Sequence, residues 1–441
     1  MESGCRLLLL AMSGVRVCDE DLLRIGLTMP GFVERDKVIA SLPSLGLLTL
    51  AAHTPDHWRI EYRDHDAGDF DAAEVAREFD LIAISSLSAR AFDAYALADG
   101  LRAFGAKVIL GGLHATTQPE EASRHSDAVV VGEGEPVWSL LLADFEAGSL
   151  QSRYEARRPF DLADSRVPRY DLLEIERYNR LTLQTTRGCP RACHFCGASR
   201  LLGPYRRKPI DLVARELDAI LAIWPQPFLE LADDNTFLDR DWSMRLARLL
   251  AGYPVRWFSE ADVSVADHEP LLDALAVSGC AQLLIGFESP KVASLSTMDP
   301  AGWKASRLDG YAEAVQKIQA RGIGVIGCFV VGWDEDDDSV FEATRDAAET
   351  LELADVQVTI ATPFSGTEFH DRLRHEGRLL TPTPWREATL FDLAFEPKRM
   401  SRDALVSGFH WLVREVYSDE AVARRRRTFG ACRRAQRRLG A

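Results

Sequence analysis

Disulfide-forming cysteine pairs and long apolar runs are both missing from this chain. Its 441 residues include eight cysteines, a density that does not predict a disulfide framework. Five of them are scattered along the sequence: Cys5, Cys18, Cys280, Cys328 and Cys432. No stretch approaches the roughly eighteen apolar residues of a membrane helix, and the run from Leu7 to Ala11 is too short for a secretory signal. These absences predict a cytoplasmic protein without membrane insertion.

Basic residues are also in short supply. Lysine and arginine number 52 against 67 aspartates and glutamates, so the formal charge is −15 and a nucleic-acid partner is not expected. The exception is the stretch 421–441, which contains eight arginines and no acidic residue. This cluster predicts a solvated terminal helix, and contact with an anion or a membrane surface is the alternative interpretation.

The length and the apolar content predict two domains followed by a tail. Hydrophobic residues make up 46% of the chain, which is enough for more than one core. In the first 145 residues, short apolar runs alternate with helical patterns, and this alternation predicts a parallel, doubly wound α/β sheet. We expect strands at 6–11, 58–63, 81–85, 107–110 and 128–131, and helices at 45–53, 92–104, 119–125 and 135–145.

Small and polar residues follow three of these expected strands. Ligands of doubly wound sheets bind outside the carboxyl ends of the strands, where glycine lets the backbone approach a large ligand. The dinucleotide fingerprint GxGxxG is absent, so a NAD site is not predicted. The residues at these strand ends are Ser85, Ser86 and Ser88, then Gly111 to His114, then Gly132 to Glu135.

The rest of the chain divides into three parts, which leaves residues 1–147 for the first domain. Residues 148–180 are rich in Arg and Asp without sustained periodicity, which predicts a linker. From 181 to 370 about six strand–helix units follow one another, and they predict a partial or complete barrel with its chemistry at the carboxyl ends of the strands. Residues 371–441 are expected to form a small, helical and basic C-terminal region.

Three cysteines lie close together after the first expected strand of the barrel. Cys189, Cys193 and Cys196 have CxxxCxxC spacing. Thiolates are soft ligands that select zinc, copper or iron–sulfur clusters. A structural zinc site needs four ligands, normally in two paired halves, and this loop supplies three. A cubane held by three thiolates leaves one iron open to a chelating small molecule. A chance cluster of buried cysteines is the alternative interpretation.

The cysteine loop resembles the signature of the radical S-adenosylmethionine (SAM) superfamily, including the aromatic Phe195 before its last cysteine. The match extends over nearly the whole chain. It is similar to the branch that places a cobalamin-binding, Rossmann-like domain before the radical SAM barrel. Six further segments follow the pattern of that branch in order: Gly111–Thr116, Pro119–Glu121, Val131–Glu135, Asp233–Asn235, Gly286–Ser289 and Thr362–Thr367.

The resemblance implies that Cys189, Cys193 and Cys196 bind a [4Fe–4S] cluster, whose open iron SAM chelates before it is cleaved reductively. The Gly-Gly-Glu stretch that often holds the methionine amino group is replaced here by Ala232-Asp233-Asp234, and either aspartate could accept that ammonium. Beyond the cysteines no catalytic residue is predicted. The SAM-binding residues expected from the resemblance are Phe195, Asp233, Asp234, Ser259, Glu260 and Glu288.

The resemblance also implies a cobalamin site in the first domain. Many cobalamin modules carry Asp-x-His-x-x-Gly, whose histidine binds the metal, whereas here the histidine of Asp64-His65-Asp66-Ala67-Gly68 is out of register. Many members of the branch lack this histidine, so the expectation of cobalamin is kept. The residues expected to face cobalamin are Ser85, Ser88, Gly111, Gly112, His114, Gly132 and Glu133.

The function implied by the resemblance is cobalamin-dependent methyl transfer to a small molecule, at an unactivated carbon or a phosphinate. The alternative is another reaction of the same branch, such as oxidative cyclisation, ring contraction or transfer of the 3-amino-3-carboxypropyl group of SAM. A non-catalytic iron–sulfur protein is disfavoured, because an electron carrier needs neither an open iron nor so large a scaffold. A flavodoxin or ferredoxin is the expected electron donor. The sequence does not identify the substrate.

Overall fold

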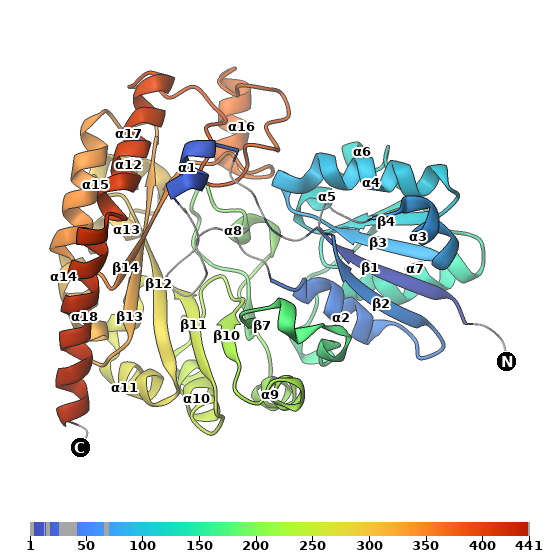
Figure 1. The fold of residues 1–441 in the computed structure, drawn as a ribbon, viewed down its shortest axis with the longest axis horizontal. Helices are drawn as coiled ribbons and strands as arrows, with labels where there is room; N and C mark the ends of the chain where they lie inside the picture. Colours follow the sequence, from blue (N-terminus) through green and yellow to red (C-terminus); the bar gives the residue numbers. More distant parts are fainter. Residues whose placement is uncertain (1–3, 13, 15–17, 26–41, 66–69, 440–441) are drawn as a thin grey trace.

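The computed structural model describes residues 4–12, 14, 18–25, 42–65 and 70–439. They form two parallel sheets, one in each half of the chain, with helices packed around both (Figure 1). The expected α/β architecture is confirmed: a Rossmann-like domain is followed by a partial barrel and a helical C-terminal region.

The first sheet contains six parallel strands in the order β2-β1-β3-β4-β5-β6. Its outermost strand, β6, lies inside the stretch 148–180, where the sequence pattern predicts a linker. β6 pairs with β5 and buries Tyr154, but its three residues are too few to show a strand periodicity. The strands are β1 (Arg6–Ala11), β2 (Arg59–Asp64), β3 (Leu81–Ser85), β4 (Lys107–Gly111), β5 (Ala128–Val131) and β6 (Arg153–Glu155).

Helices cover both faces of the first sheet, and each face has its own core. Leu7 and Leu9 of β1 pack on the side of α2 and α7, while Leu8 and Leu10 pack on the side of α3 and α4. Burial on both faces explains why the strands appear in the sequence as continuous apolar runs. The helices are α2 (Leu45–His53), α3 (Ala72–Glu78), α4 (Ala91–Ala103), α5 (Leu113–Thr117), α6 (Pro119–Ala122) and α7 (Glu135–Glu146).

The second sheet is the partial barrel. Its six parallel strands lie in the order β14-β13-β12-β11-β10-β7, and no ladder joins β14 to β7 in the described part of the chain. The strands are β7 (Leu181–Leu183), β10 (Phe228–Leu231), β11 (Arg256–Ala261), β12 (Cys280–Glu288), β13 (Gly324–Val331) and β14 (Asp355–Ile360). The helices between them are α9 (Ile210–Ile223), α10 (Arg240–Leu250), α11 (Glu269–Val277), α12 (Val292–Met298), α13 (Trp303–Arg307), α14 (Tyr311–Gln319) and α15 (Ser339–Thr350).

Side chains of the second sheet alternate between an apolar outer face and a polar inner face. Leu229 and Leu231 of β10 belong to the core shared with the helices. Glu230 lies between them and therefore points to the opposite, concave side of the sheet. On β11 the outer face carries the buried Trp257 and Ser259, and the inner face carries the buried Phe258 and the exposed Glu260. This inner face is the floor of the candidate site.

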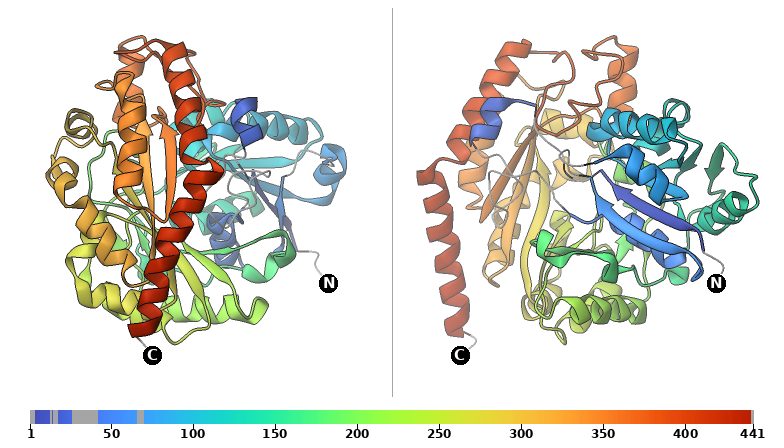
Figure 2. Two further views of the ribbon diagram at one scale, coloured as in Figure 1. Left: turned by 60° about the vertical axis from the view of Figure 1, so that its left-hand side comes forward. Right: turned by 45° about the vertical axis from the view of Figure 1, so that its right-hand side comes forward.

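The C-terminal region consists of α16 (Glu368–His375), α17 (Arg402–Val416) and α18 (Asp419–Leu439). α18 carries the arginine cluster and extends along the outside of the barrel, next to α14 (Figure 2). Arg424 of α18 forms an ion pair with Glu349 of α15. Part of the cluster is thereby used to hold the helix against the barrel.

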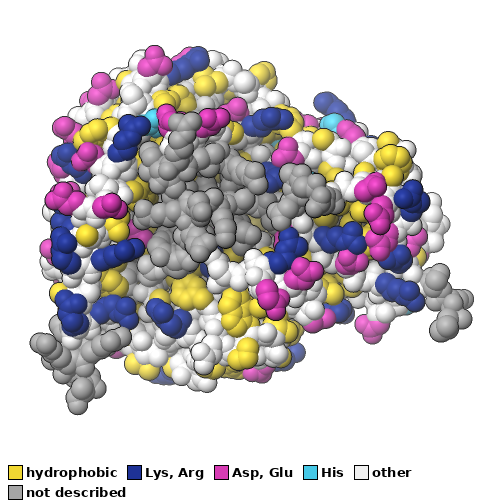
Figure 3. Space-filling model, viewed as in Figure 1, with side chains coloured by type: hydrophobic (Ala, Val, Ile, Leu, Met, Phe, Trp, Pro, Cys, Tyr) yellow, Lys and Arg dark blue, Asp and Glu magenta, His cyan; other side chains and the backbone are white. Residues whose placement is uncertain are grey.

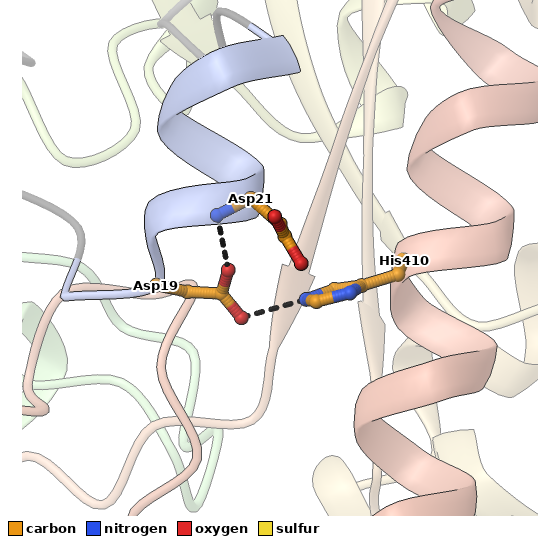
Figure 4. A group of neighbouring side chains, drawn as sticks. All are labelled: Asp19, Asp21 and His410. Carbon is orange, nitrogen blue, oxygen red and sulfur yellow. Dashed lines mark hydrogen bonds and ion pairs between the residues drawn. The ribbon is translucent and has the colours of Figure 1, made fainter.

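The short helix α1 (Glu20–Ile25) lies against this C-terminal region. Asp19, just before α1, is 2.6 Å from His410 of α17, between Oδ2 and Nε2 (Figure 4). Its other carboxylate oxygen accepts the backbone amides of Asp21 and Leu22. Both oxygens of Asp19 are therefore engaged in positioning α1.

The surface carries charges of both signs. Acidic and basic side chains lie next to one another over both domains on the face seen in Figure 3. Among the described residues, no helix is both long enough and apolar enough to cross a lipid bilayer.

The C-terminal region also joins the first domain to the barrel. Trp385 is only 2% exposed and belongs to the core of the first domain, although it comes from the far end of the chain. Its indole nitrogen donates to Glu121 Oε1 at 3.1 Å. Gln118 Nε2 donates to Ser365 Oγ at 2.6 Å and makes a second contact between the two halves. These contacts fix the position of the first domain over the mouth of the barrel.

Replacing Trp385 by Ala is expected to destabilise the protein by about 3–5 kcal/mol, because it leaves a cavity inside the first domain. The thermal unfolding midpoint of the variant should fall clearly below that of the wild type. Leu87→Ala is the control, since Leu87 is 47% exposed. Equal midpoints for the two variants would contradict the assignment of Trp385 to the core.

Candidate active site

The acidic carboxyl end of β10 anchors the cysteine loop. Asp233 accepts hydrogen bonds from the backbone amides of Thr185 and Thr186, at 2.7 and 2.8 Å. Asp234 accepts one from the amide of Gly188 at 2.7 Å. Ionised acceptors make such bonds stronger than neutral ones. The two carboxylates therefore determine where the loop leaves the sheet.

Gly188 allows the chain to turn between the short strands β8 (Thr186–Arg187) and β9 (Arg206–Arg207), which pair antiparallel. Its φ is +85°, and a Cβ at this position would lie 2.6 Å from the backbone oxygen of Gly203. Glycine tolerates both the positive φ and the close backbone. The segment between the two strands is thus folded back on itself, and it contains the three cysteines.

None of the three cysteines of this loop forms a disulfide. Cys193 is buried, while Cys189 and Cys196 are partly exposed. Burial raises the pKa of the Cys193 thiol to about 12, and the ammonium of Lys304 acts in the opposite direction. Asn235 donates from Nδ2 to Cys189 Sγ over 3.8 Å. Three soft donors in one loop, two of them accessible, fit a cubane cluster with one iron left open.

A buried ion pair lies beside Cys193. Lys304 of α13 donates from Nζ to Glu288 Oε1 and to the backbone oxygen of Gly286, both at 2.9 Å. Although burial opposes it, the Glu288 carboxylate raises the pKa of Lys304 above its usual range. Glu288 has a φ of 63°, which is uncommon for a residue with a side chain and costs free energy. The surrounding structure therefore holds this carboxylate in one place.

Glu260 stands on the inner face of the barrel at the carboxyl end of β11. Solvent reaches its side chain through the open mouth of the barrel. The surrounding protein, together with the carboxylates of Glu230 and Asp234, nevertheless raises the pKa of Glu260 from its ordinary value of 4.5 to about 8. A carboxyl group with this pKa can both donate and accept a hydrogen bond near neutral pH.

The structure separates the expected SAM-binding residues into two groups. Asp234, Glu260 and Glu288 lie around the barrel mouth. Asp233 is buried, and its carboxylate accepts hydrogen bonds from the loop amides and from the hydroxyls of Thr185 and Thr236. Ser259 is fully buried on the outer face and bonds to Thr236, so the alternation of β11 points it away from the site. Phe195 is partly buried, with its ring 6.1 Å from that of Trp333.

A cavity of about 300 Å³ lies between the first domain and the barrel. Gly112, with a φ of +93°, forms part of its wall, and a Cβ there would lie 2.9 Å from Ser85 Oγ. Gly132 also has a positive φ, of +78°. Glycines in the wall of a cavity let a large, flat ligand lie close to the backbone. Five of the residues expected to face cobalamin line this cavity: Ser85, Gly111, Gly112, Gly132 and Glu133.

Ser88 and His114, the other two, do not line this cavity. His114 is 1% exposed, and its two ring nitrogens bond to Ser88 Oγ at 3.1 Å and to Tyr95 OH at 2.9 Å. Trp385 covers its ring at 5.2 Å in an edge-on arrangement. His65, the histidine that is out of register, also lies outside the cavity and packs on Phe70 at 5.2 Å.

Arg187 connects this cavity to the cysteine loop. Its guanidinium donates to Glu133 at 2.5 Å and to Glu135 at 2.8 Å, and both carboxylates belong to the first domain. Although burial opposes it, Arg187 lowers the pKa of Glu135. Arg206 donates to the second oxygen of Glu133 at 3.0 Å. All of these side chains except that of Arg206 also line the cavity.

Sequence reasoning missed Lys304 and the ion-pairing role of Arg187. Lys304 lies outside every motif, 16 positions after Glu288, and only the packing of α13 brings the two together. Arg187 lies within the cysteine motif, but its partners are more than 50 residues away. A long-range ion pair leaves no periodic signal in a single sequence.

Two family models cover most of the two domains described above. Residues 35–141 match the B12 binding domain, and residues 183–348 match the Radical SAM superfamily. A third model, a domain of unknown function (DUF4070), matches residues 367–439.

Several curated relatives of the chain are methyltransferases. Bacteriochlorophyllide d C-12(1)-methyltransferase of Chlorobaculum tepidum is 29% identical over 402 residues, which cover 88% of this chain and 86% of the relative. Hopanoid C-2 methylase of Rhodopseudomonas palustris is 25% identical over 364 residues, which cover 78% and 67%.

The fold is shared with a solved radical S-adenosylmethionine methyltransferase. The structure of TsrM from Kitasatospora setae with cobalamin and a [4Fe–4S] cluster bound has a TM-score of 0.69 at 15% identity. The match covers 96% of this chain and 89% of that one.

The chain belongs to the radical SAM superfamily, in the branch with an N-terminal B12-binding domain. Within that branch it is a radical SAM enzyme. Its cofactors are therefore a [4Fe–4S] cluster, SAM and cobalamin, as expected from the sequence.

Replacing Cys193 by Ala should abolish cluster binding, because two thiols remain in the loop. Iron and sulfide per chain, measured after anaerobic reconstitution, are expected to fall to a small fraction of the wild-type values. Cys328→Ala is the matched control, since it removes a thiol of β13 outside the loop and should keep the cluster. A full complement of iron in Cys193→Ala would contradict the assignment.

Glu260 should make stability depend on pH. Its pKa is higher in the folded chain than in the unfolded one, so the folded state binds the extra proton between about pH 4.5 and 8. The free energy of unfolding should therefore fall as pH rises through this range. Denaturant titrations of Glu260→Gln should show a shallower decrease than the wild type. Glu174→Gln, at a side chain that is 77% exposed, should leave the decrease unchanged.

Proposed function

We propose that this enzyme transfers a methyl group to a carbon atom of a small molecule held between the cavity of the first domain and the mouth of the barrel. The observation that carries the proposal is the shared wall of the cavity. Gln184, Arg187 and Ala232 from the barrel line it together with the strand ends of the first domain. When bound, the cluster supplies the electron that cleaves SAM, and cobalamin serves as the methyl carrier.

The residues around the barrel mouth would bind the amino-acid part of SAM. An ammonium nitrogen has three protons to donate, which the carboxylates of Asp234 and Glu288 can accept. Lys304 also has three donors, of which Gly286 and Glu288 use two, so one is left for a carboxylate. Glu260 stands next to these groups and can bond to a hydroxyl. In this arrangement the chain binds both the ammonium and the carboxylate of the amino-acid part of SAM.

The strand ends of the first domain would hold cobalamin. We assign this role to Ser85, Gly111, Gly112, Gly132 and Glu133, because they line the cavity. Ser88 and His114 are left out, since their polar groups are already bonded to each other and to Tyr95. We further propose that a flavodoxin or ferredoxin reduces the cluster in the cytoplasm, where a reducing environment protects it.

Carbon is the proposed methyl acceptor because the named relatives methylate carbon positions of a bacteriochlorophyllide and of hopanoids. The decisive experiment is an anaerobic incubation with SAM that carries a deuterated methyl group, hydroxocobalamin, a reductant and a panel of candidate acceptors. Mass spectrometry should find the label on a carbon of one acceptor, together with S-adenosylhomocysteine and 5′-deoxyadenosine. Formation of methylthioadenosine, or a cyclised product without label, would support one of the alternative reactions instead.

Lys304→Met should weaken SAM binding at least about tenfold, because it removes a buried, charged hydrogen-bond donor worth roughly 1.5–3 kcal/mol. Equilibrium binding of SAM to the reconstituted, oxidised protein measures the effect without turnover. Lys291→Met is the control, since Lys291 pairs with the exposed Asp337 on the surface. Unchanged SAM affinity in Lys304→Met would refute the proposed role.

A further inference from the structure

Arg187 belongs to both cofactor sites. Its backbone lies two residues before Cys189, in the strand that leads into the cysteine loop. Its guanidinium reaches the opposite domain and forms part of the cavity wall. The side chain is 12% exposed, and its partners Glu133 and Glu135 are 11% and 8% exposed.

The geometry of this ion-pair group is fixed from several directions. Glu133 accepts from Arg187, from Arg206 and, at 2.6 Å, from the backbone amide of Phe160. The Nε of Arg187 also donates to Gln184 at 3.0 Å. A buried ionic group tolerates little displacement, because a partner left unpaired in low dielectric is costly. A shift of Glu133 or Glu135 is therefore transmitted to Arg187.

The backbone next to Arg187 is just as firmly held. Thr186 and Gly188, its two neighbours, donate their amides to Asp233 and Asp234. The side chain that reaches the cavity wall and the backbone that leads to the first cysteine are thus both held by hydrogen bonds to carboxylates. A ligand that fills the cavity displaces water from Glu133, Glu135 and Arg187, which strengthens their attraction and restricts the start of the loop.

From these contacts we propose that Arg187 is a positioning residue that couples the cobalamin cavity to the cysteine loop, so that each cofactor stabilises the binding of the other. The inference rests on the proposed placement of cobalamin in this cavity. By linkage, the effect is reciprocal: cobalamin raises the affinity of the chain for the cluster by the same free energy with which the cluster tightens the binding of cobalamin.

The test measures iron loss rather than turnover. Full-length reconstituted protein is exposed to an iron chelator, with and without saturating hydroxocobalamin, and the loss of iron is followed by absorbance. In the wild type, hydroxocobalamin should slow the loss at least about fivefold, which corresponds to a coupling at the lower end of the common range expressed in the release of the cluster. In Arg187→Met, the rates with and without hydroxocobalamin should be equal.

Arg180→Met is the matched control. Arg180 is a similarly buried arginine, 4% exposed, and its Nε lies 2.7 Å from Glu230 Oε2. Neither Arg180 nor Glu230 lines the cavity. This variant should keep the full protection by hydroxocobalamin. If Arg187→Met does not hold a cluster, Glu135→Gln serves as a milder change, since it keeps the pairing of Arg187 with Glu133 and should reduce the protection.

The outcomes separate this inference from the proposed function. A wild-type protein that fails to bind hydroxocobalamin would overturn the cobalamin placement together with the coupling. A wild type that binds it but loses iron at an unchanged rate would overturn the coupling alone. Undiminished protection in both Arg187→Met and Glu135→Gln would show that the coupling does not pass through Arg187.

Discussion

Two carboxylates at the end of β10 accept the backbone amides at the start of the cysteine loop, and the rest of the site is arranged around these bonds. The Asp233 carboxylate accepts hydrogen bonds from the loop amides and from neighbouring hydroxyls, so its role is structural. Asp234 uses one oxygen for Gly188 and still faces the barrel mouth. Both aspartates therefore hold the loop, and Asp234 also presents a negative charge to a ligand in the barrel mouth.

Much of the fold could be predicted from the sequence because its strands are buried on both faces. Their continuous apolar runs stand out, and the strand Leu81–Ser85 and the helix Leu45–His53 have the predicted bounds. β6 and α3 (Ala72–Glu78) escaped prediction for the opposite reason. β6 has three residues, and a single side chain of α3, that of Val75, is buried, so neither leaves a clear apolar period.

The site was predictable only where its residues are neighbours in the chain. The cysteine spacing is local, and the glycines that line the cavity follow strands that could themselves be recognised. Whether His114 faces a ligand depends on Trp385, which comes from a distant segment and covers it. The same holds for Ser259, whose direction is decided by the register of β11, and for Lys304, whose partner lies on another element.

The small sheet of β8 and β9 has a consequence for how the metal site is assembled. It closes the chain between Thr186 and Arg207 by backbone hydrogen bonds, with Gly188 packed against the backbone of Gly203. Closing a flexible loop of about twenty residues costs conformational entropy that grows only slowly with its length. Because contacts within the protein meet this cost, the three thiols are carried on a closed segment, which raises their effective concentration toward a common ligand.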